Sequence, residues 1–151
     1  MLISLVINFI VVAVCVLLHF EAINILTNTL FKPKATPRIR ILLSLFACFF
    51  AHLLEVLIFA FAYYVYMQVG GFGQLIGGDL EGHGLFGTPS TSFIDCIYFS
   101  LTCYTSLGFG DLAPTGWLRF LAGVEALTGL LLIAWTASFM YLEMQKHWKV
   151  K

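Results

Sequence analysis

The fold of this chain is decided by the stretch Thr105-Ser106-Leu107-Gly108-Phe109-Gly110-Asp111, which lies between a short amphipathic segment and a long apolar one. Its two glycines alternate with larger residues, and glycine adopts a positive φ without a steric penalty. A chain in which left- and right-handed residues alternate turns successive carbonyl groups toward the same side. Because hard cations prefer oxygen ligands, such a row of carbonyls predicts a cation-binding segment.

The apolar surroundings of this stretch restrict what it can be. Non-helical backbone at membrane depth is tolerated only where protein buries it or where it lines a water-filled cavity. The stretch therefore predicts a pore or a binding site inside a membrane protein. A glycine turn between two membrane helices is the plainer alternative, and the length and helical context of the motif favour the pore.

The stretch resembles the signature filter of the potassium-channel pore family, usually written T-V-G-Y-G-D. Gly108, Gly110 and Asp111 match that pattern, with Thr105 before them and Pro114 after. The resemblance extends over roughly residues 41–145, which include both flanking helices. It implies that potassium exchanges its water shell for backbone carbonyl oxygens.

Three positions depart from the family pattern. Ser106 replaces threonine and keeps the hydroxyl, and Leu107 replaces valine with a side chain expected to point away from the pore. Phe109 replaces tyrosine, which removes a phenol that normally bonds behind the filter, although G-F-G versions occur in relatives. The resemblance implies potassium ligands from the Ser106 hydroxyl and from the carbonyls of Ser106, Leu107, Gly108 and Phe109.

A short helix is predicted directly before this stretch, over residues 93–104. It is too short to cross a bilayer and suits a re-entrant helix, with capping residues and a proline in residues 88–92. Its C-terminus would point into the membrane and present the negative end of the helix dipole to a cation. In the family that this chain resembles, this element is the pore helix.

The resemblance also implies three residues that support the filter. Tyr98 and Phe99 fall where relatives carry an aromatic pair that braces it. A bond from Tyr98 to Asp111 and simple aromatic packing stay equally open. Thr102 falls where some members carry a carboxylate partner for that aspartate, so filter inactivation that depends on this carboxylate is not expected here.

The composition excludes most soluble classes of protein, because 60% of the residues are hydrophobic and only 11% are charged. The net charge of zero offers no basic face to nucleic acid. No acid/base pair, nucleophile triad or phosphate loop indicates an enzyme, an organic cofactor or a small-molecule substrate. The cysteines lie in apolar segments without metal-binding spacing, so we expect free thiols at Cys15, Cys48, Cys96 and Cys103.

Membrane-spanning helices are predicted at residues 2–26, 41–68 and 116–143. The first lacks the basic start and cleavage site of a signal peptide, so we expect it in the mature protein. Residues 27–40 read as a connection that holds four of the eight basic residues and no acid, which indicates the cytoplasmic side. The glycine-rich residues 69–91 contain no lysine or arginine and read as an outer turret without strong local structure.

Ionisable residues at membrane depth are expensive and face the protein interior or water. His52 and Glu55 lie three residues apart on one helix face, and Glu125 lies in the last span. Three interpretations stay open: a structural pair between the second and third spans, which we favour, a gate, or a cavity lined by Glu125. Gly129 is placed like the gating hinge of relatives, and it equally fits a close-packing site.

These observations predict an all-α membrane protein with three transmembrane helices, a re-entrant pore helix and a selectivity-filter loop, assembled as a tetramer. The predicted parts are an extra helix with a basic loop (1–40), a pore domain (41–145) and a cytoplasmic tail (146–151). We expect a homotetramer among the lipids of the plasma (inner) membrane, with the N-terminus outside and the C-terminus in the cytoplasm.

The predicted function is a potassium-selective channel that carries K⁺ down its electrochemical gradient and uses no other cofactor. A weakly selective cation channel and a non-conducting scaffold or partner subunit are the alternatives. A voltage sensor is not expected, because Arg38 and Arg40 fall in a loop rather than on a regularly charged helix. Gating by tension, lipid, pH or a partner subunit stays open.

Overall fold

The computed structural model describes residues 2–30, 36–77 and 92–147. In chain order, this part of the protein forms α1 (Leu2–Ile25), a π-helical turn η1 (Leu26–Leu30), α2 (Pro37–Val69), β1 (Leu75–Gly77), α3 (Phe93–Tyr104), β2 (Leu112–Pro114) and α4 (Leu118–His147). The predicted short helix at residues 93–104 is confirmed at both of its ends.

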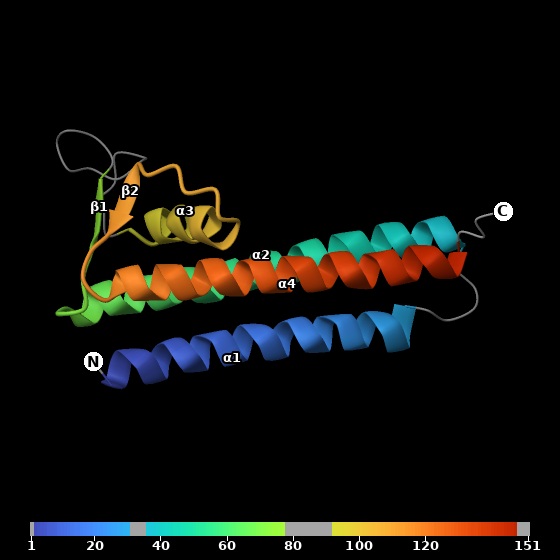
Figure 1. The fold of residues 1–151 in the computed structure, drawn as a ribbon, viewed down its shortest axis with the longest axis horizontal. Coiled ribbons are helices and arrows are strands. Elements are labelled where there is room, and N and C mark those ends of the chain that lie inside the picture. The colour runs from blue at the N-terminus through green and yellow to red at the C-terminus, as the bar shows by residue number, and fades with distance from the viewer. Residues whose placement is uncertain (1, 31–35, 78–91, 148–151) are drawn as a thin grey trace.

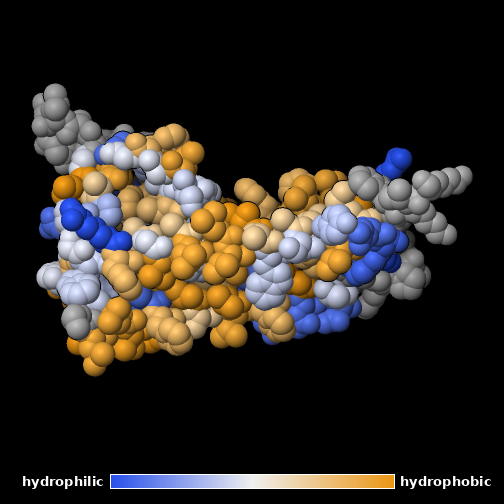
Figure 2. All heavy atoms as spheres, in the orientation of Figure 1, coloured by the Kyte–Doolittle hydropathy of each residue, from blue (hydrophilic) through white to orange (hydrophobic). Residues whose placement is uncertain are grey.

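Three long helices run side by side, and β1, α3 and β2 gather toward one end of them (Figure 1). Within the described residues, three helices are long and apolar enough to cross a membrane: Leu2–Asn28, Arg38–Val69 and Leu118–Lys146. Figure 2 shows an apolar band over the middle of these helices, with hydrophilic residues at the two ends of the molecule. The predicted fold class of three spanning helices with a short helix before the last one is therefore confirmed.

Three helix boundaries differ clearly from the prediction. The connection predicted at residues 27–40 is shorter, because the first helix continues through η1 and α2 already begins at Pro37. Proline suits the first turn of a helix, where its missing N–H would have no partner. The last helix also extends beyond the predicted Glu143 and ends at His147.

The N-terminus of α3 is held by a side-chain cap. The Ser92 hydroxyl accepts a hydrogen bond from the Asp95 amide at 3.2 Å and donates to the Asp95 carboxylate at 2.8 Å. The other proposed capping residues, 88–91, lie outside the described part of the chain. The cap starts a helix that packs against both α2 and α4.

A two-stranded antiparallel sheet pairs β1, in the predicted turret, with β2, which follows residues 105–111. It pairs Leu75 with Pro114 and Gly77 with Leu112. The prediction of no strong local structure is therefore wrong for residues 75–77, because their partner lies far along the chain and no local signal marks it. A side chain at Gly77 would place its Cβ 2.1 Å from the Asp111 carbonyl oxygen, so glycine is required there. Residues 78–91 of the predicted turret lie outside the described residues.

Candidate functional site

The backbone of residues 105–111, which we call the candidate filter, alternates in handedness. Ser106, Gly108 and Gly110 have φ of 57°, 55° and 82°, whereas Leu107 and Phe109 between them have no positive φ. The alternation expected from the two glycines is therefore present, and it begins one step earlier, at a serine. This geometry turns successive carbonyl groups of the segment toward one side.

The amides of the candidate filter point back to the C-terminus of α3. Leu107 and Gly108 donate to the Thr102 carbonyl oxygen at 2.9 and 3.1 Å, and Ser106 donates to the Cys103 carbonyl at 2.9 Å. These bonds use carbonyl groups that a helix end leaves without partners. Among the described residues, no donor reaches the carbonyl oxygens of residues 106–109. The amides of Ser106, Leu107 and Gly108 are therefore satisfied, while the carbonyl acceptors of residues 106–109 remain available.

Two threonines support this arrangement differently from what the resemblance implied. The Thr102 carbonyl is the shared acceptor for the filter amides, while its hydroxyl donates to the Phe99 carbonyl at 2.8 Å. The Thr105 hydroxyl donates to the Leu101 carbonyl at 2.7 Å. Thr105 thus closes the end of α3 with its side chain.

Asp111, at the end of the candidate filter, is held by Tyr98. The Tyr98 hydroxyl donates to the Asp111 carboxylate at 2.6 Å, and the second carboxylate oxygen accepts from the Leu112 amide at 3.0 Å. The bond between Tyr98 and Asp111 is therefore present. The Asp111 carboxylate raises the pKa of the Tyr98 phenol, because it accepts the phenolic hydrogen.

Phe99, the other member of the predicted aromatic pair, packs and does not bond. It is buried, and its ring meets the Tyr63 ring edge-on with centroids 5.1 Å apart. Tyr63 in turn leads to Glu125. The two members of the pair therefore have different contacts: Tyr98 bonds to the end of the candidate filter, and Phe99 packs in the protein interior.

Glu125 joins three helices inside the protomer. It is fully buried, and its carboxylate accepts hydrogen bonds from Tyr63 of α2 at 2.6 Å and from Ser100 of α3 at 2.5 Å. Both donors are also fully buried. The interpretation in which Glu125 lines an open cavity is therefore wrong, because the side chain has no exposed surface. Its partners lie on the helix faces that meet here, which a single sequence does not reveal.

His52 and Glu55 also link helices. Their side chains contact each other at 3.1 Å, on one face of α2 as their spacing predicts. His52 reaches Thr136 of α4 at 2.9 Å, so a polar contact does join the second and third spans. The Tyr104 hydroxyl, at the end of α3, donates to Glu55 and lies 2.8 Å from His52.

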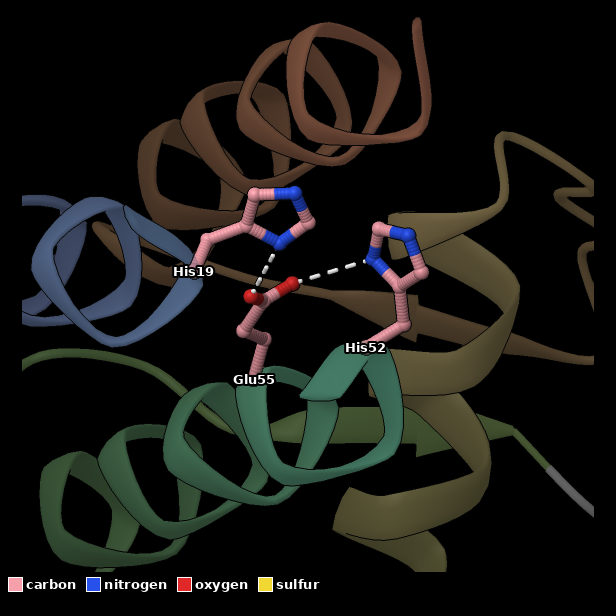
Figure 3. Close-up of side chains that lie close together, drawn as sticks. All are labelled: His19, His52 and Glu55. Atoms are coloured by element: carbon pink, nitrogen blue, oxygen red, sulfur yellow. Dashed lines mark hydrogen bonds and ion pairs between the residues drawn. The ribbon is translucent and has the colours of Figure 1, made fainter. Parts of the chain in front are cut away.

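His19 of α1 completes this group, and sequence reasoning missed it. Its Nδ1 lies 2.8 Å from a Glu55 oxygen, opposite the His52 contact (Figure 3). A signal was present, because His19 is an ionisable residue in an apolar span, and such residues usually have a partner. The first helix is thus tied to α2 by a polar contact between buried side chains.

Gly129 is a close-packing site in this structure. A Cβ atom there would lie 2.1 Å from the Tyr104 carbonyl oxygen, and α4 runs through the position without a break. The glycine therefore lets α4 approach the end of α3, just before the candidate filter. A hinge at Gly129 stays a prediction.

A family model described as an ion channel matches residues 51–146, which is more than half of the chain. The chain belongs to this ion channel family. The matched part of the channel runs from the middle of α2 to the end of α4 and includes α3 and the candidate filter, whereas α1 lies outside it. Among curated proteins and solved structures, none matches the channel significantly.

Proposed function

We propose that the channel is selective for potassium and that residues 105–111 are its selectivity filter. The observation that carries this proposal is the alternating backbone, with positive φ at Ser106, Gly108 and Gly110. The amides of Ser106, Leu107 and Gly108 bond to α3, and the carbonyl oxygens of residues 106–109 have no donor among the described residues. Such oxygens replace the hydration shell of a potassium ion. Thr105 and Asp111 then anchor the two ends of the filter.

A homotetramer is part of this proposal. One chain supplies one filter segment, and a ring of carbonyls around an axis needs four. The side chains of Leu107 and Phe109 are 57% and 65% exposed in the single protomer. Exposed apolar side chains need cover, and neighbouring subunits would supply it around the filter of the proposed tetramer. A mass of four protomers in native mass spectrometry is the expected result.

The orientation follows from the two ends of the molecule. The N-terminus lies at the same end as α3, β1 and β2, and the C-terminus lies at the opposite end (Figure 1). Arg38, Arg40 and Lys146 lie toward that opposite end, and basic residues favour the cytoplasmic side. We therefore place the filter end outside, in the plasma (inner) membrane.

Gating belongs to the same proposal. The four residues considered for gating lie where α4 meets α2 and α3: Gly129, Glu125, Glu55 and His52. A movement of α4 against α3 would alter the Glu125 bonds and the contact between His52 and Thr136. Contacts of these residues would therefore change when the channel opens, whatever stimulus opens it.

The proposal is tested by ion flux from liposomes that hold the purified channel, with potassium inside and sodium outside. Flux that follows the potassium gradient and excludes sodium is expected. Equal passage of both ions would replace the proposal with a weakly selective cation channel. Conduction that appears only when a partner subunit is added would indicate a non-conducting subunit.

A further inference from the structure

A cluster of three potential metal ligands lies between the long helices, away from the filter carbonyls. It consists of His19 on α1 with His52 and Glu55 on α2 (Figure 3). Each imidazole directs its Nδ1 atom at a different oxygen of the one carboxylate, at 2.8 and 3.1 Å. The three ligand atoms all lie within 4.8 Å of one another. The side chains of His19 and Glu55 are buried, while that of His52 is 19% exposed and leaves a way in.

The outer nitrogens of both rings meet at a single hydroxyl group. Thr136 Oγ1 lies 2.9 Å from Nε2 of His52 and 3.2 Å from Nε2 of His19. The Thr136 hydroxyl has one hydrogen and therefore can donate to only one of the two rings. The other ring must donate to the Thr136 oxygen through its own Nε2–H.

These contacts are one hydrogen short when both imidazoles are neutral and Glu55 is ionised. A neutral imidazole carries a hydrogen on only one of its nitrogens. If both hydrogens are on Nδ1, one Nε2 faces the Thr136 oxygen with lone pairs on both atoms. If either hydrogen moves to Nε2, that ring turns a bare Nδ1 toward the carboxylate. The Tyr104 hydroxyl, 2.8 Å from Nδ1 of His52, can give its hydrogen to that ring only by withdrawing it from Glu55. Every assignment therefore leaves two lone pairs opposed, and one further proton or a metal ion would remove the conflict.

A metal ion between the two Nδ1 atoms and the carboxylate removes this conflict. Both rings would then carry their hydrogen on Nε2, and both would donate to the Thr136 oxygen. Histidines that bind metals usually donate their other N–H to such an outer partner, which fixes the ring orientation. Thr136 therefore acts as the positioning residue for both imidazoles.

The ligand set selects the class of metal. Two imidazole nitrogens and one carboxylate oxygen suit Zn²⁺, whereas Ca²⁺ and Mg²⁺ prefer oxygen ligands throughout. Ligands about 2.05 Å from a tetrahedral zinc lie about 3.3 Å apart. The two Nδ1 atoms lie 2.8 and 3.1 Å from different oxygens of the Glu55 carboxylate, so zinc binding requires the carboxylate to turn one oxygen toward both rings. Water or the Tyr104 phenol can take the fourth position.

We propose that His19, His52 and Glu55 bind a zinc ion that links α1 to α2. Zinc would take the place of the contacts that Glu55 and His52 make with the Tyr104 hydroxyl. Tyr104 is the last residue of α3 and directly precedes the candidate filter. The site thus connects the extra first helix to the end of α3, and its occupancy does not depend on which ion the filter selects.

The test measures zinc in the full-length protein after treatment with a chelator and dialysis against Zn²⁺. Mass spectrometry of the metal content should find one zinc per chain, and zinc should raise the melting temperature. His19→Gln, His52→Gln and Glu55→Gln should each weaken zinc binding at least about tenfold in calorimetric titration. Replacing the other two of the four histidines, His83 and His147, by glutamine is the matched control and should leave binding unchanged.

A second variant guards against misfolding of the ligand variants. Thr136→Val keeps all three zinc ligands and removes only their shared outer partner, so binding should weaken about 10–100-fold. The proposal is overturned if the unaltered protein takes up no stoichiometric zinc. A proton would then occupy this centre in place of the metal. The proposal is equally overturned if zinc binding survives His52→Gln and disappears when His83 and His147 are replaced.

Discussion

The candidate filter and the buried carboxylates differ in whether their hydrogen-bond acceptors have donors. At the filter, the carbonyl oxygens of residues 106–109 have no donor among the described residues, and the segment is exposed in the protomer. Glu55 and Glu125 are fully buried, and each of their oxygens has a partner. Both regions adjoin α3, because the candidate filter follows it directly and the two carboxylates bond to its residues Tyr104 and Ser100.

This difference predicts that substitutions in the two regions affect different properties, ion conduction in one and stability in the other. A buried acceptor without a donor costs free energy, so the carboxylates can be retained only because other helices supply donors. Acceptors that face one axis at the surface of a protomer remain available to an ion. We therefore expect substitutions in the filter to abolish flux with little loss of stability, and substitutions at the buried carboxylates to lower stability first.

The largest expected effect comes from Gly110→Ala. Its φ of 82° disfavours an L-residue, while no atom lies within 4 Å of an added Cβ, so the strain is confined to the backbone. A left-handed conformation costs an L-residue only about 1–2 kcal/mol. Potassium flux from liposomes should be lost, while the melting temperature stays close to that of the unaltered channel.

Gly123→Ala is the control for this substitution. Gly123 lies within α4, where φ is helical, and nothing lies within 4 Å of an added Cβ. Flux should be retained there, because alanine favours a helix. Normal potassium flux in Gly110→Ala would show that ions do not use this backbone.

The second effect concerns Glu125. Glu125→Leu leaves the buried Tyr63 hydroxyl without its acceptor, at a cost of about 1–3 kcal/mol, whereas the Ser100 hydroxyl keeps the Val56 carbonyl as an acceptor. The melting temperature in detergent should fall clearly. Glu125→Gln keeps a carbonyl acceptor and should fall less. A leucine variant as stable as the unaltered channel would contradict the structural role that we assign to Glu125.

The smallest effect is expected for Tyr98→Phe, which tests the one side-chain bond to the filter end. Loss of the donor to Asp111 should lower potassium selectivity a few-fold in bi-ionic flux measurements, without loss of assembly. Because Asp111 raises the pKa of Tyr98, the bond is fully present at neutral pH and is lost only as pH rises through that raised pKa. The two proteins should therefore become alike in strongly alkaline solution, and a constant difference would contradict this account.

The sequence by itself determined the features that depend on neighbouring residues. Hydropathy over about 20 residues identifies a span, and a short amphipathic run after capping residues identifies α3. Alternating glycines predicted the backbone of the candidate filter, because the freedom of φ belongs to single residues. These local causes also explain why the boundaries of α3 were correct.

Only the tertiary structure decided which distant residues meet. Three sets of contacts join separate elements: the pairing of β1 with β2, the contact of His19 with Glu55, and the bonds of Tyr63 and Ser100 to Glu125. Such contacts depend on how each helix is rotated about its own axis. The long helices are apolar on nearly all sides, so no stripe in the sequence indicates which face turns inward. The rotation, and with it the polar interior, is set by packing between helices.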